Sequence, residues 1–131
     1  MWSPVKQKKQ AAMMQYYDVI CVGAGPAGLA AALSARENGA ERVCIIERDH
    51  EAGGILQQCI HNGFGLQIFK EDLTGPEYAQ RFIDRVKASD IDIMTDTMVL
   101  EITPEKELHI MSPHEGYRII RAGAIILCMG C

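Results

Sequence analysis

The sequence lacks any long hydrophobic run. In its 131 residues, Gly, Pro or charged side chains interrupt every apolar stretch well before the roughly 20 residues that a membrane-spanning helix needs. A transmembrane helix is therefore excluded. An excess of positive charge is missing as well, since 13 Lys and Arg stand against 17 Asp and Glu, for a net charge of −4. Because nucleic-acid binding depends on basic residues that neutralise phosphates, no nucleic-acid partner is expected.

No secretory leader is expected either. The first 15 residues contain no continuous apolar segment, and the five cysteines are an odd number. A reducing, cytoplasmic setting is therefore expected. Cys21 and Cys44 lie in apolar runs typical of strands, where a thiol packs as a small buried hydrophobe. Residues 1–16 are interpreted as a flexible polar leader to which no function is assigned.

A strand, a glycine turn and a helix follow one another after this leader. Residues 17–22 (YDVICV) are typical of a short buried strand, and residues 23–28 (GAGPAG) lead into an Ala-rich segment, 29–37, that favours a helix. Residues 42–47 (RVCIIE) predict a second strand that ends in a carboxylate. This order predicts a βαβ unit with parallel strands. With 48% hydrophobic residues, the chain can fill one modest core, so residues 17–131 are expected to form one domain.

The glycine turn carries the clearest chemical signal. Gly23 permits a tight turn, Gly25 lets a pyrophosphate approach the backbone, and Gly28 allows the helix to pack on the strand. The free N–H groups and positive end of the helix dipole favour the same anion. Glu47, about 20 residues further on, can accept hydrogen bonds from ribose hydroxyls and disfavours a 2′-phosphate. The motif predicts a dinucleotide with an unphosphorylated adenosine ribose, either FAD or NAD.

The second half of the chain is expected to complete an α/β sheet. Five glycines between residues 51 and 75 favour an irregular, ligand-shaped segment. Thr74 and Glu77 fit a capping box at the start of an amphipathic helix over 76–88. Short β-like runs then predict one parallel strand and a small β-meander, at residues 91–94, 98–102, 108–111 and 117–120. Residues 122–129 (AGAIILCM) suit a final strand buried on both faces.

Two further motifs create a resemblance to a known family. Glu47-Arg48 followed by Gly53-Gly54, together with Cys128-Met129-Gly130 after the last apolar run, resembles the FAD-binding domain of the glutathione reductase and thioredoxin reductase superfamily. Residues 53–65 (GGILQQCIHNGFG) further resemble bacterial NAD(FAD)-utilising dehydrogenases linked to glycerol-3-phosphate dehydrogenase. The resemblance covers residues 17–131. It implies an α/β, Rossmann-like FAD/NAD(P)-binding fold with a parallel sheet and a small β-meander, incomplete at the C-terminus.

The resemblance also implies the contacts to FAD. The glycine turn would bind the pyrophosphate, Glu47 and Arg48 the adenosine side, and Gly54 with Ile55 the path to the ribityl chain. Val99 would bind the adenine edge through its backbone, and the segment after the last strand would close over the cofactor. The expected cofactor-binding residues are Gly23, Gly25, Pro26, Ala27, Gly28, Glu47, Arg48, Gly54, Ile55, Val99, Met129 and Gly130.

The chain departs from the disulfide reductases of this superfamily at their redox cysteines. Only Cys59 follows Gly53-Gly54, out of register, so a flavin-linked dithiol is not expected. Cys59 as a redox thiol and His61 as a proton carrier remain alternatives to simple packing and loop hydrogen bonds. Cys128 and Cys131 form a C-x-x-C pair without a second pair at ligand spacing, and Cys128 is expected to be buried, so no metal site is predicted. No catalytic residue is assigned.

The implied function is that of the FAD-binding portion of an FAD-dependent, NAD(P)-linked oxidoreductase. Such a protein passes electrons between nicotinamide, or a substrate, and flavin. NAD(P) is expected on a domain absent from these residues, so the expected partners are FAD and the remainder of a parent polypeptide or a partner subunit. Two alternatives stay open: a non-catalytic dinucleotide-binding module, and a small subunit of an amine- or opine-oxidising flavoprotein complex.

Overall fold

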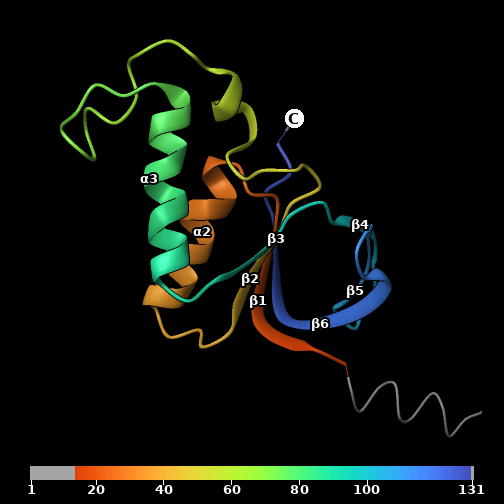
Figure 1. The fold of residues 1–131 in the computed structure, drawn as a ribbon. Coiled ribbons are helices and arrows are strands. Elements are labelled where there is room, and N and C mark those ends of the chain that lie inside the picture. The colour runs from red at the N-terminus through yellow and green to blue at the C-terminus, as the bar shows by residue number, and fades with distance from the viewer. Residues whose placement is uncertain (1–13, 131) are drawn as a thin grey trace, which may run out of the picture.

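Residues 14–130 are described by the structure, which is a computed structural model (Figure 1). Two α-helices, a short 3-10 helix and six strands follow in the order β1 (Tyr16–Val22), α2 (Pro26–Glu37), β2 (Val43–Ile46), η1 (Gly54–Gln58), α3 (Gly75–Ala88), β3 (Asp92–Met94), β4 (Met98–Ile102), β5 (Glu107–Ser112) and β6 (Gly116–Leu127). The predicted βαβ unit, second helix and meander are confirmed. Of the proposed leader, residues 1–13 lie outside the described part, and β1 begins one residue earlier than expected.

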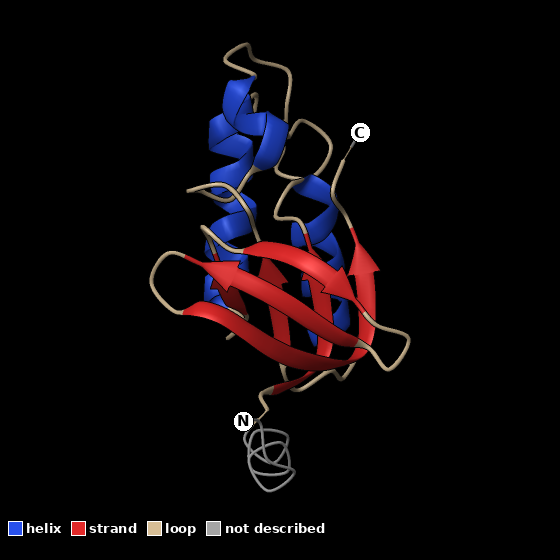
Figure 2. Cartoon of the chain, turned by 90° about the vertical axis from the view of Figure 1, so that its right-hand side faces the viewer, coloured by secondary structure: helices blue, strands red, loops and turns tan. Residues whose placement is uncertain are grey.

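One six-stranded sheet, in the order β3-β2-β1-β6-β5-β4, organises the domain. The first four strands in this order, β3, β2, β1 and β6, are parallel, and β6, β5 and β4 form an antiparallel meander. Figures 1 and 2 show three layers, with the helices on one side of the parallel strands and the meander on the other. This order places the carboxyl ends of β1 and β2 beside the end of β6. In open α/β sheets, that edge is where ligands bind.

Two hydrophobic cores hold the three layers together. One packs α2 and α3 on the sheet, around residues such as Leu29, Val86 and Cys21. The other packs the parallel strands on the meander, around Ile20, Cys44 and other apolar side chains. Cys21 and Cys44 are fully buried, as predicted. Burial raises the pKa of each of these two thiols to about 12, so both stay protonated at neutral pH.

The prediction for the last apolar run is wrong. Residues 122–129 do not form a separate strand buried on both faces; they continue from residues 117–120 as one strand, β6, that ends at Leu127. Ile126 and Leu127 are 37% and 58% exposed, and Cys128 is only half-buried. The reason is that β6 leaves the meander and joins the parallel strands. Ala124 to Leu127 pair with β1 alone, and no other described element covers the outer side of this segment.

A long loop between η1 and α3 is tied to the helix by aromatic contacts. Phe69 packs edge-on against Tyr78 and Phe82, with ring centroids 5.8 and 5.6 Å apart. The Arg85 guanidinium lies 4.7 Å from the centroid of the Phe69 ring. The apolar side chains of the predicted amphipathic helix therefore have two different environments. Ala79, Ile83 and Val86 are buried in the core, whereas Tyr78 and Phe82 are half-buried and pack against the loop. Within residues 14–130, no helix is long and apolar enough to cross a membrane.

The start of α3 shows the predicted capping box. The Thr74 hydroxyl accepts a hydrogen bond from the Glu77 N–H, and the Glu77 carboxylate accepts one from the Thr74 N–H at 3.1 Å. These hydrogen bonds satisfy donors that the first turn of a helix otherwise leaves free. The Thr74 hydroxyl also donates a hydrogen bond to the Glu77 carboxylate at 2.7 Å, and this bond, together with the one from the Thr74 N–H, lowers the pKa of the Glu77 carboxyl.

Replacing Thr74 with Ala should lower the free energy of unfolding by about 1 kcal/mol, because the helix loses its N-cap acceptor. Urea denaturation followed by circular dichroism measures the change. Thr74→Ser, which keeps the hydroxyl, is the matched control and should lose much less. Equal losses in the two variants would show that the methyl group, not the cap, matters.

Candidate functional site

The glycine turn after β1 is shaped by close main-chain packing. Gly23 has a φ of +110°, and a Cβ there would overlap the carbonyl group of Cys128. A Cβ on Gly28 would overlap the Gly23 carbonyl instead. The predicted roles of these two glycines, a tight turn and the close approach of helix to strand, are thus visible in the contacts. They draw the end of β1, the first turn of α2 and the end of β6 together.

Gly25 is different, because nothing in the described part of the chain requires a glycine there. Its φ of −74° and ψ of −175° suit any residue, and no atom of residues 14–130 lies within 4 Å of where its Cβ would be. The space beside it is open. A glycine kept where neither backbone nor packing needs it fits a ligand that must approach the main chain closely.

The start of α2 beside Gly25 presents free donors. Gly25 is the N-cap, no side chain caps the helix, and Pro26 occupies the first turn. The first amides of a helix have no partners inside it and carry the positive end of its dipole. An uncapped helix start beside open space therefore suits a phosphate group. Pro26 and Ala27 are exposed at this end.

Glu47 is buried at the end of β2 and connects two turns. Only 6% of its surface is exposed. Its Oε1 accepts a hydrogen bond from the Ala24 N–H at 3.1 Å, and its Oε2 accepts one from the Asp49 N–H at 3.0 Å. Each carboxylate oxygen keeps a further lone pair that can accept a hydrogen bond from a hydroxyl. Glu47 thus holds the glycine turn in place.

The second glycine pair packs directly on the first turn. The Gly53 N–H donates to the Ala24 carbonyl at 2.8 Å, and a Cβ on Gly54 would lie 3.0 Å from the Cα of Gly25. Gly53 and Gly54 both have positive φ, which suits glycine. Ile55 follows with 63% of its surface exposed. The segment predicted to lead toward the ribityl chain therefore begins beside the proposed pyrophosphate site.

Of the remaining predicted residues, Arg48, Met129 and Gly130 follow the strands that end at this edge of the sheet, whereas Val99 lies on the meander. Arg48 follows Glu47 and is exposed, and Met129 and Gly130 are exposed after β6, next to the Gly23 turn. Val99 is half-buried on β4 and packs on the core beneath the meander. It follows Thr97, whose N–H donates to the Glu47 carbonyl at 3.0 Å. No contact joins Val99 to the glycine turn itself.

Three residues whose main-chain contacts shape this region were not assigned to the site from the sequence. Ala24 is fully buried and bonds to both Glu47 and Gly53. Cys128 presents its carbonyl to Gly23. Gly75, at the start of α3, donates its N–H to the Cys59 carbonyl at 2.8 Å, where a Cβ would leave no room. Ala24 carries a signal, because it lies between two glycines of the motif, whereas Gly75 is one of five glycines between residues 51 and 75 and nothing local distinguishes it.

Cys59 and His61 make separate contacts within their own loop. The Cys59 thiol donates to the Ile55 carbonyl at 3.4 Å, and the His61 Nδ1 lies 3.0 Å from the Asn62 carbonyl oxygen. The His61 ring stacks 5.4 Å from Phe64. These are local loop contacts, and no hydrogen bond joins the two side chains. Among residues 14–130, no group of three or more His, Cys, Asp or Glu side chains could hold a metal ion; Cys131 lies outside the described residues.

The fold and this edge together define a Rossmann-like, dinucleotide-binding α/β domain. Residues 18–120 match the family described as FAD dependent oxidoreductase. The chain belongs to this family. Its sheet combines a parallel core with an antiparallel meander, as in the FAD-binding folds of that group.

Individual relatives point to the same group. A ferredoxin–NADP reductase of Streptococcus pneumoniae serotype 19F (strain G54) is 32% identical over 126 residues, which are 90% of this chain and 36% of the relative. A thioredoxin reductase of Ureaplasma parvum serovar 3 is 35% identical over 81 residues, 61% of this chain and 25% of the relative. The crystal structure of T. acidophilum thioredoxin reductase superposes with a TM-score of 0.72 and 25% identity, covering 88% of this chain and 36% of that one. The chain thus spans about a third or less of these relatives.

Replacing Glu47 with Ala should lower the free energy of unfolding of the cofactor-free chain by about 2–3 kcal/mol. The reason is that the Ala24 and Asp49 N–H groups lose their acceptor in a site largely closed to water. Glu47→Gln, which keeps one acceptor oxygen, should lose about half as much. Urea denaturation without added nucleotide measures both.

Glu101→Ala, on the exposed β4, is the control and should change stability by less than about 0.5 kcal/mol. A Glu47→Ala variant as stable as the wild type would mean that the two hydrogen bonds contribute nothing to folding. Glu47 would then matter for ligand binding alone.

Proposed function

We propose that the chain binds FAD at the carboxyl ends of β1 and β2 and is the FAD-binding part of an NAD(P)-linked oxidoreductase. The observation that supports this most directly is Gly25. Its missing Cβ leaves open space that no residue between 14 and 130 fills, beside an uncapped helix start. Pyrophosphate fits both features. The family to which the chain belongs is FAD-dependent, which favours FAD over free NAD.

Each predicted residue then has a role toward the cofactor. The turn of Gly23 and Gly25 and the helix start of Pro26, Ala27 and Gly28 would hold the pyrophosphate. Glu47 would accept hydrogen bonds from the adenosine ribose. Arg48 would flank the adenosine, Val99 the adenine, Gly54 and Ile55 the ribityl chain, and Met129 with Gly130 would close over the pyrophosphate. When bound, FAD supplies the electron and hydride chemistry, while these residues bind and orient it.

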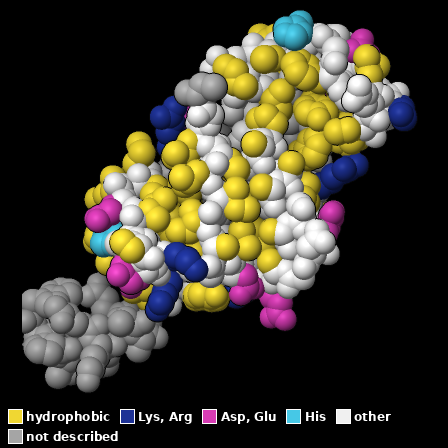
Figure 3. All heavy atoms as spheres, turned by 180° about the vertical axis from the view of Figure 1, so that it is seen from behind, with side chains coloured by type: hydrophobic (Ala, Val, Ile, Leu, Met, Phe, Trp, Pro, Cys, Tyr) yellow, Lys and Arg dark blue, Asp and Glu magenta, His cyan; other side chains and the backbone are white. Residues whose placement is uncertain are grey.

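The nicotinamide half of the reaction belongs to other polypeptide. The carboxyl half of β6 offers an edge for it, since Ala124 to Leu127 pair with β1 on one side only. Leu127 and Met129 are 58% and 66% exposed there, and Figure 3 shows broad hydrophobic areas on the molecular surface. We infer that a strand from the remainder of a longer chain, or from a partner subunit, adds to this edge, and that this polypeptide binds NAD(P).

The finer assignment rests on the stretch 53–65. Its likeness to NAD(FAD)-utilising dehydrogenases linked to glycerol-3-phosphate dehydrogenase supports a cytoplasmic enzyme of that kind. An amine- or opine-oxidising complex shares the same FAD-binding motifs. Bleaching of the flavin absorption separates the two in the longer chain or complex: NADH or NADPH would bleach it in the first case, and an amine or opine substrate in the second.

Replacing Gly25 with Val should abolish measurable FAD binding, a loss of at least tenfold in affinity, because the side chain fills the space reserved for the pyrophosphate. The free energy of unfolding should fall by no more than about 1 kcal/mol, since the backbone conformation suits Val and only the N-cap preference changes. Fluorescence titration with FAD and urea denaturation measure the two effects.

Ser34→Val, on the exposed side of α2, adds similar bulk away from the turn and should bind FAD normally. FAD binding to Gly25→Val with wild-type affinity would contradict the placement of the pyrophosphate. Binding of NAD without any binding of FAD to the wild-type chain would overturn the flavin assignment.

A further inference from the structure

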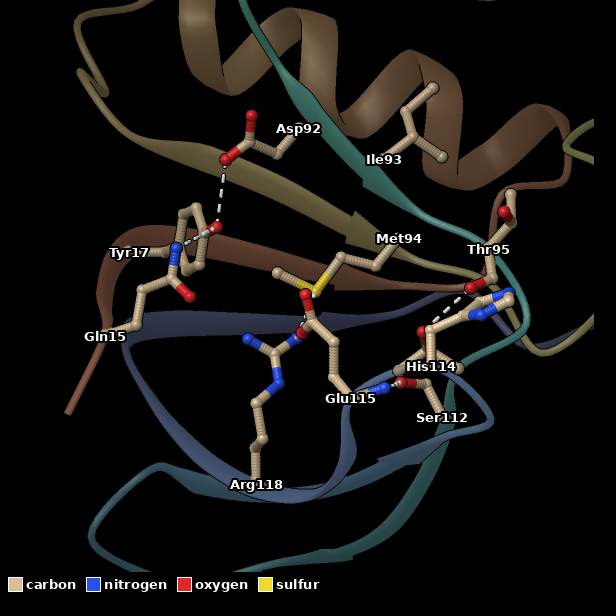
Figure 4. A pocket seen from close by; sticks show the side chains of 11 residues that line it. Gln15, Tyr17, Asp92, Ile93, Met94, Thr95, Ser112, His114, Glu115 and Arg118 are labelled. Atoms are coloured by element: carbon tan, nitrogen blue, oxygen red, sulfur yellow. Dashed lines mark hydrogen bonds and ion pairs between the residues drawn. The ribbon is translucent and has the colours of Figure 1, made fainter. Parts of the chain in front are cut away.

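The two sides of the meander carry different side chains. Ile110 is buried against the parallel strands, and Arg118, which pairs with it in register, points to the same inner side. Figure 4 shows Arg118 reaching toward Met94 of β3 beside a cavity, and its Nη2 lies 3.7 Å from the Met94 sulfur. Because neighbouring residues of a strand point to opposite sides, Met111 and Tyr117 lie on the outer side of the meander.

An apolar row crosses this outer side from one strand to the next. Met98 on β4 pairs with Met111 on β5, and Met111 pairs with Tyr117 on β6. The three residues are 48%, 42% and 53% exposed. Figure 2 shows the meander in front of the parallel strands, with no described helix across it. Within residues 14–130, the apolar row is therefore uncovered.

A β-bulge in β4 enlarges the exposed apolar surface. The pairing of β4 with β5 shifts between Val99 and Glu101, so Leu100 is the extra residue. Leu100 and Glu101 together oppose His109 on β5, where an unbroken strand would present one residue. Leu100 is 56% exposed. Because of the bulge, β4 adds a further apolar side chain beside the row, followed directly by an acidic one.

Opposite charges flank the row on the two outer strands of the meander. Glu101 lies on β4, and Arg121 lies on β6, an even number of residues from Tyr117 and so on the same outer side. Both are exposed, and neither forms an ion pair among the described residues. Between them, the His109 ring contacts the Tyr117 hydroxyl. The outer side thus has an acidic strand, a largely apolar centre and a basic strand.

We propose that the outer side of the meander binds the same surface of a second copy of the chain, around a two-fold axis that runs along β5. In this arrangement β4 of one copy lies on β6 of the other. Met98 would meet the partner's Tyr117, Met111 would meet the partner's Met111, and Glu101 would lie near the partner's Arg121. Each of the unlike contacts occurs twice.

The arrangement of charges is what favours a second copy over another partner. A two-fold interface uses one surface on both copies, so that surface must be its own complement. An apolar row centred on Met111, with Glu101 toward one side and Arg121 toward the other, meets this requirement. An unrelated partner would need no such symmetry. The proposal does not depend on FAD.

The size of the surface predicts a weak dimer. Covering the outer side of three short strands would bury about 500 Å² on each copy, or about 1,000 Å² in all, which is the lower limit for a specific interface. We therefore expect a reversible dimer with a dissociation constant of about 10–100 μM. A monomer at low micromolar concentration and a dimer near millimolar concentration follow from this value.

Sedimentation velocity of the 131-residue chain without FAD, over a concentration series, tests the proposal. The average mass should rise from one copy at about 1 μM to two copies at about 1 mM and stop there, because a two-fold contact closes on itself. A chain that remains monomeric at the highest concentration would overturn the proposal. Association that continues beyond two copies would also contradict it.

Variants with a new lysine locate the contact. Met111→Lys brings two like charges together at the apolar centre and should weaken association at least tenfold. Ile60→Lys, on the loop between η1 and α3, changes a residue that is 79% exposed and should leave association unchanged. If Met111→Lys loses its cooperative unfolding transition, Met98→Lys replaces it with the same expectation. Wild-type association in the folded meander variant, or an equal loss in Ile60→Lys, would place the contact elsewhere and overturn the proposal.

A charge reversal tests the two-fold axis itself. Glu101→Arg would set like charges against the partner's Arg121 at two places and should weaken association at least threefold. Adding Arg121→Glu restores opposite charges across the interface and should return the affinity to that of the wild type. A double variant no stronger than Glu101→Arg alone would contradict the packing of β4 on the partner's β6.

Discussion

At the carboxyl end of β1, the main chains of several segments pack directly against one another with no side chains between them. The rest of the structure depends on this contact. Gly23 meets the Cys128 carbonyl, Gly28 meets the Gly23 carbonyl, and Gly54 meets Gly25. The end of β6, the start of α2 and the second glycine pair can converge because Gly23, Gly28 and Gly54 carry no Cβ. The convergence leaves free amides and open space at one edge of the sheet. Shape and donors for a diphosphate thus arise together from one packing requirement.

Glu47 shows how this edge combines stability with binding. A buried carboxylate is costly unless its oxygens are hydrogen-bonded. Here both oxygens accept main-chain N–H groups, one from the glycine turn and one from the turn after β2. The residue that suits a ribose therefore also aligns the two turns that would surround it. The Glu47 side chain thus fixes the conformation of the turn that is proposed to bind the cofactor.

The chain spans about a third or less of the length of these relatives, and it exposes apolar side chains and a strand edge. Among the described residues, the carboxyl half of β6 is paired along one edge only, and Ile126, Leu127, Ile55 and Met129 are exposed. Apolar groups and strand edges left open in this way are usual sites of attachment for further polypeptide.

Local pattern by itself determined the strand–turn–helix unit, the capping box at Thr74, the meander and the chemical character of the glycine turn. These features depend on residues close in sequence, whose spacing matches a helix, a strand or a turn. The tertiary structure alone decided the rest. The course of β6, with its exposed end, depends on which strands pair with each of its edges. A short apolar run in the sequence does not indicate this pairing.

The contacts of Ala24, Cys128 and Gly75 depend on segments that are distant in sequence. No periodicity could reveal them. The sequence also placed Val99 among the cofactor residues through resemblance, whereas the structure relates it to Glu47 only through Thr97. Residue type and spacing define what each group can do, and long-range packing decides which groups meet.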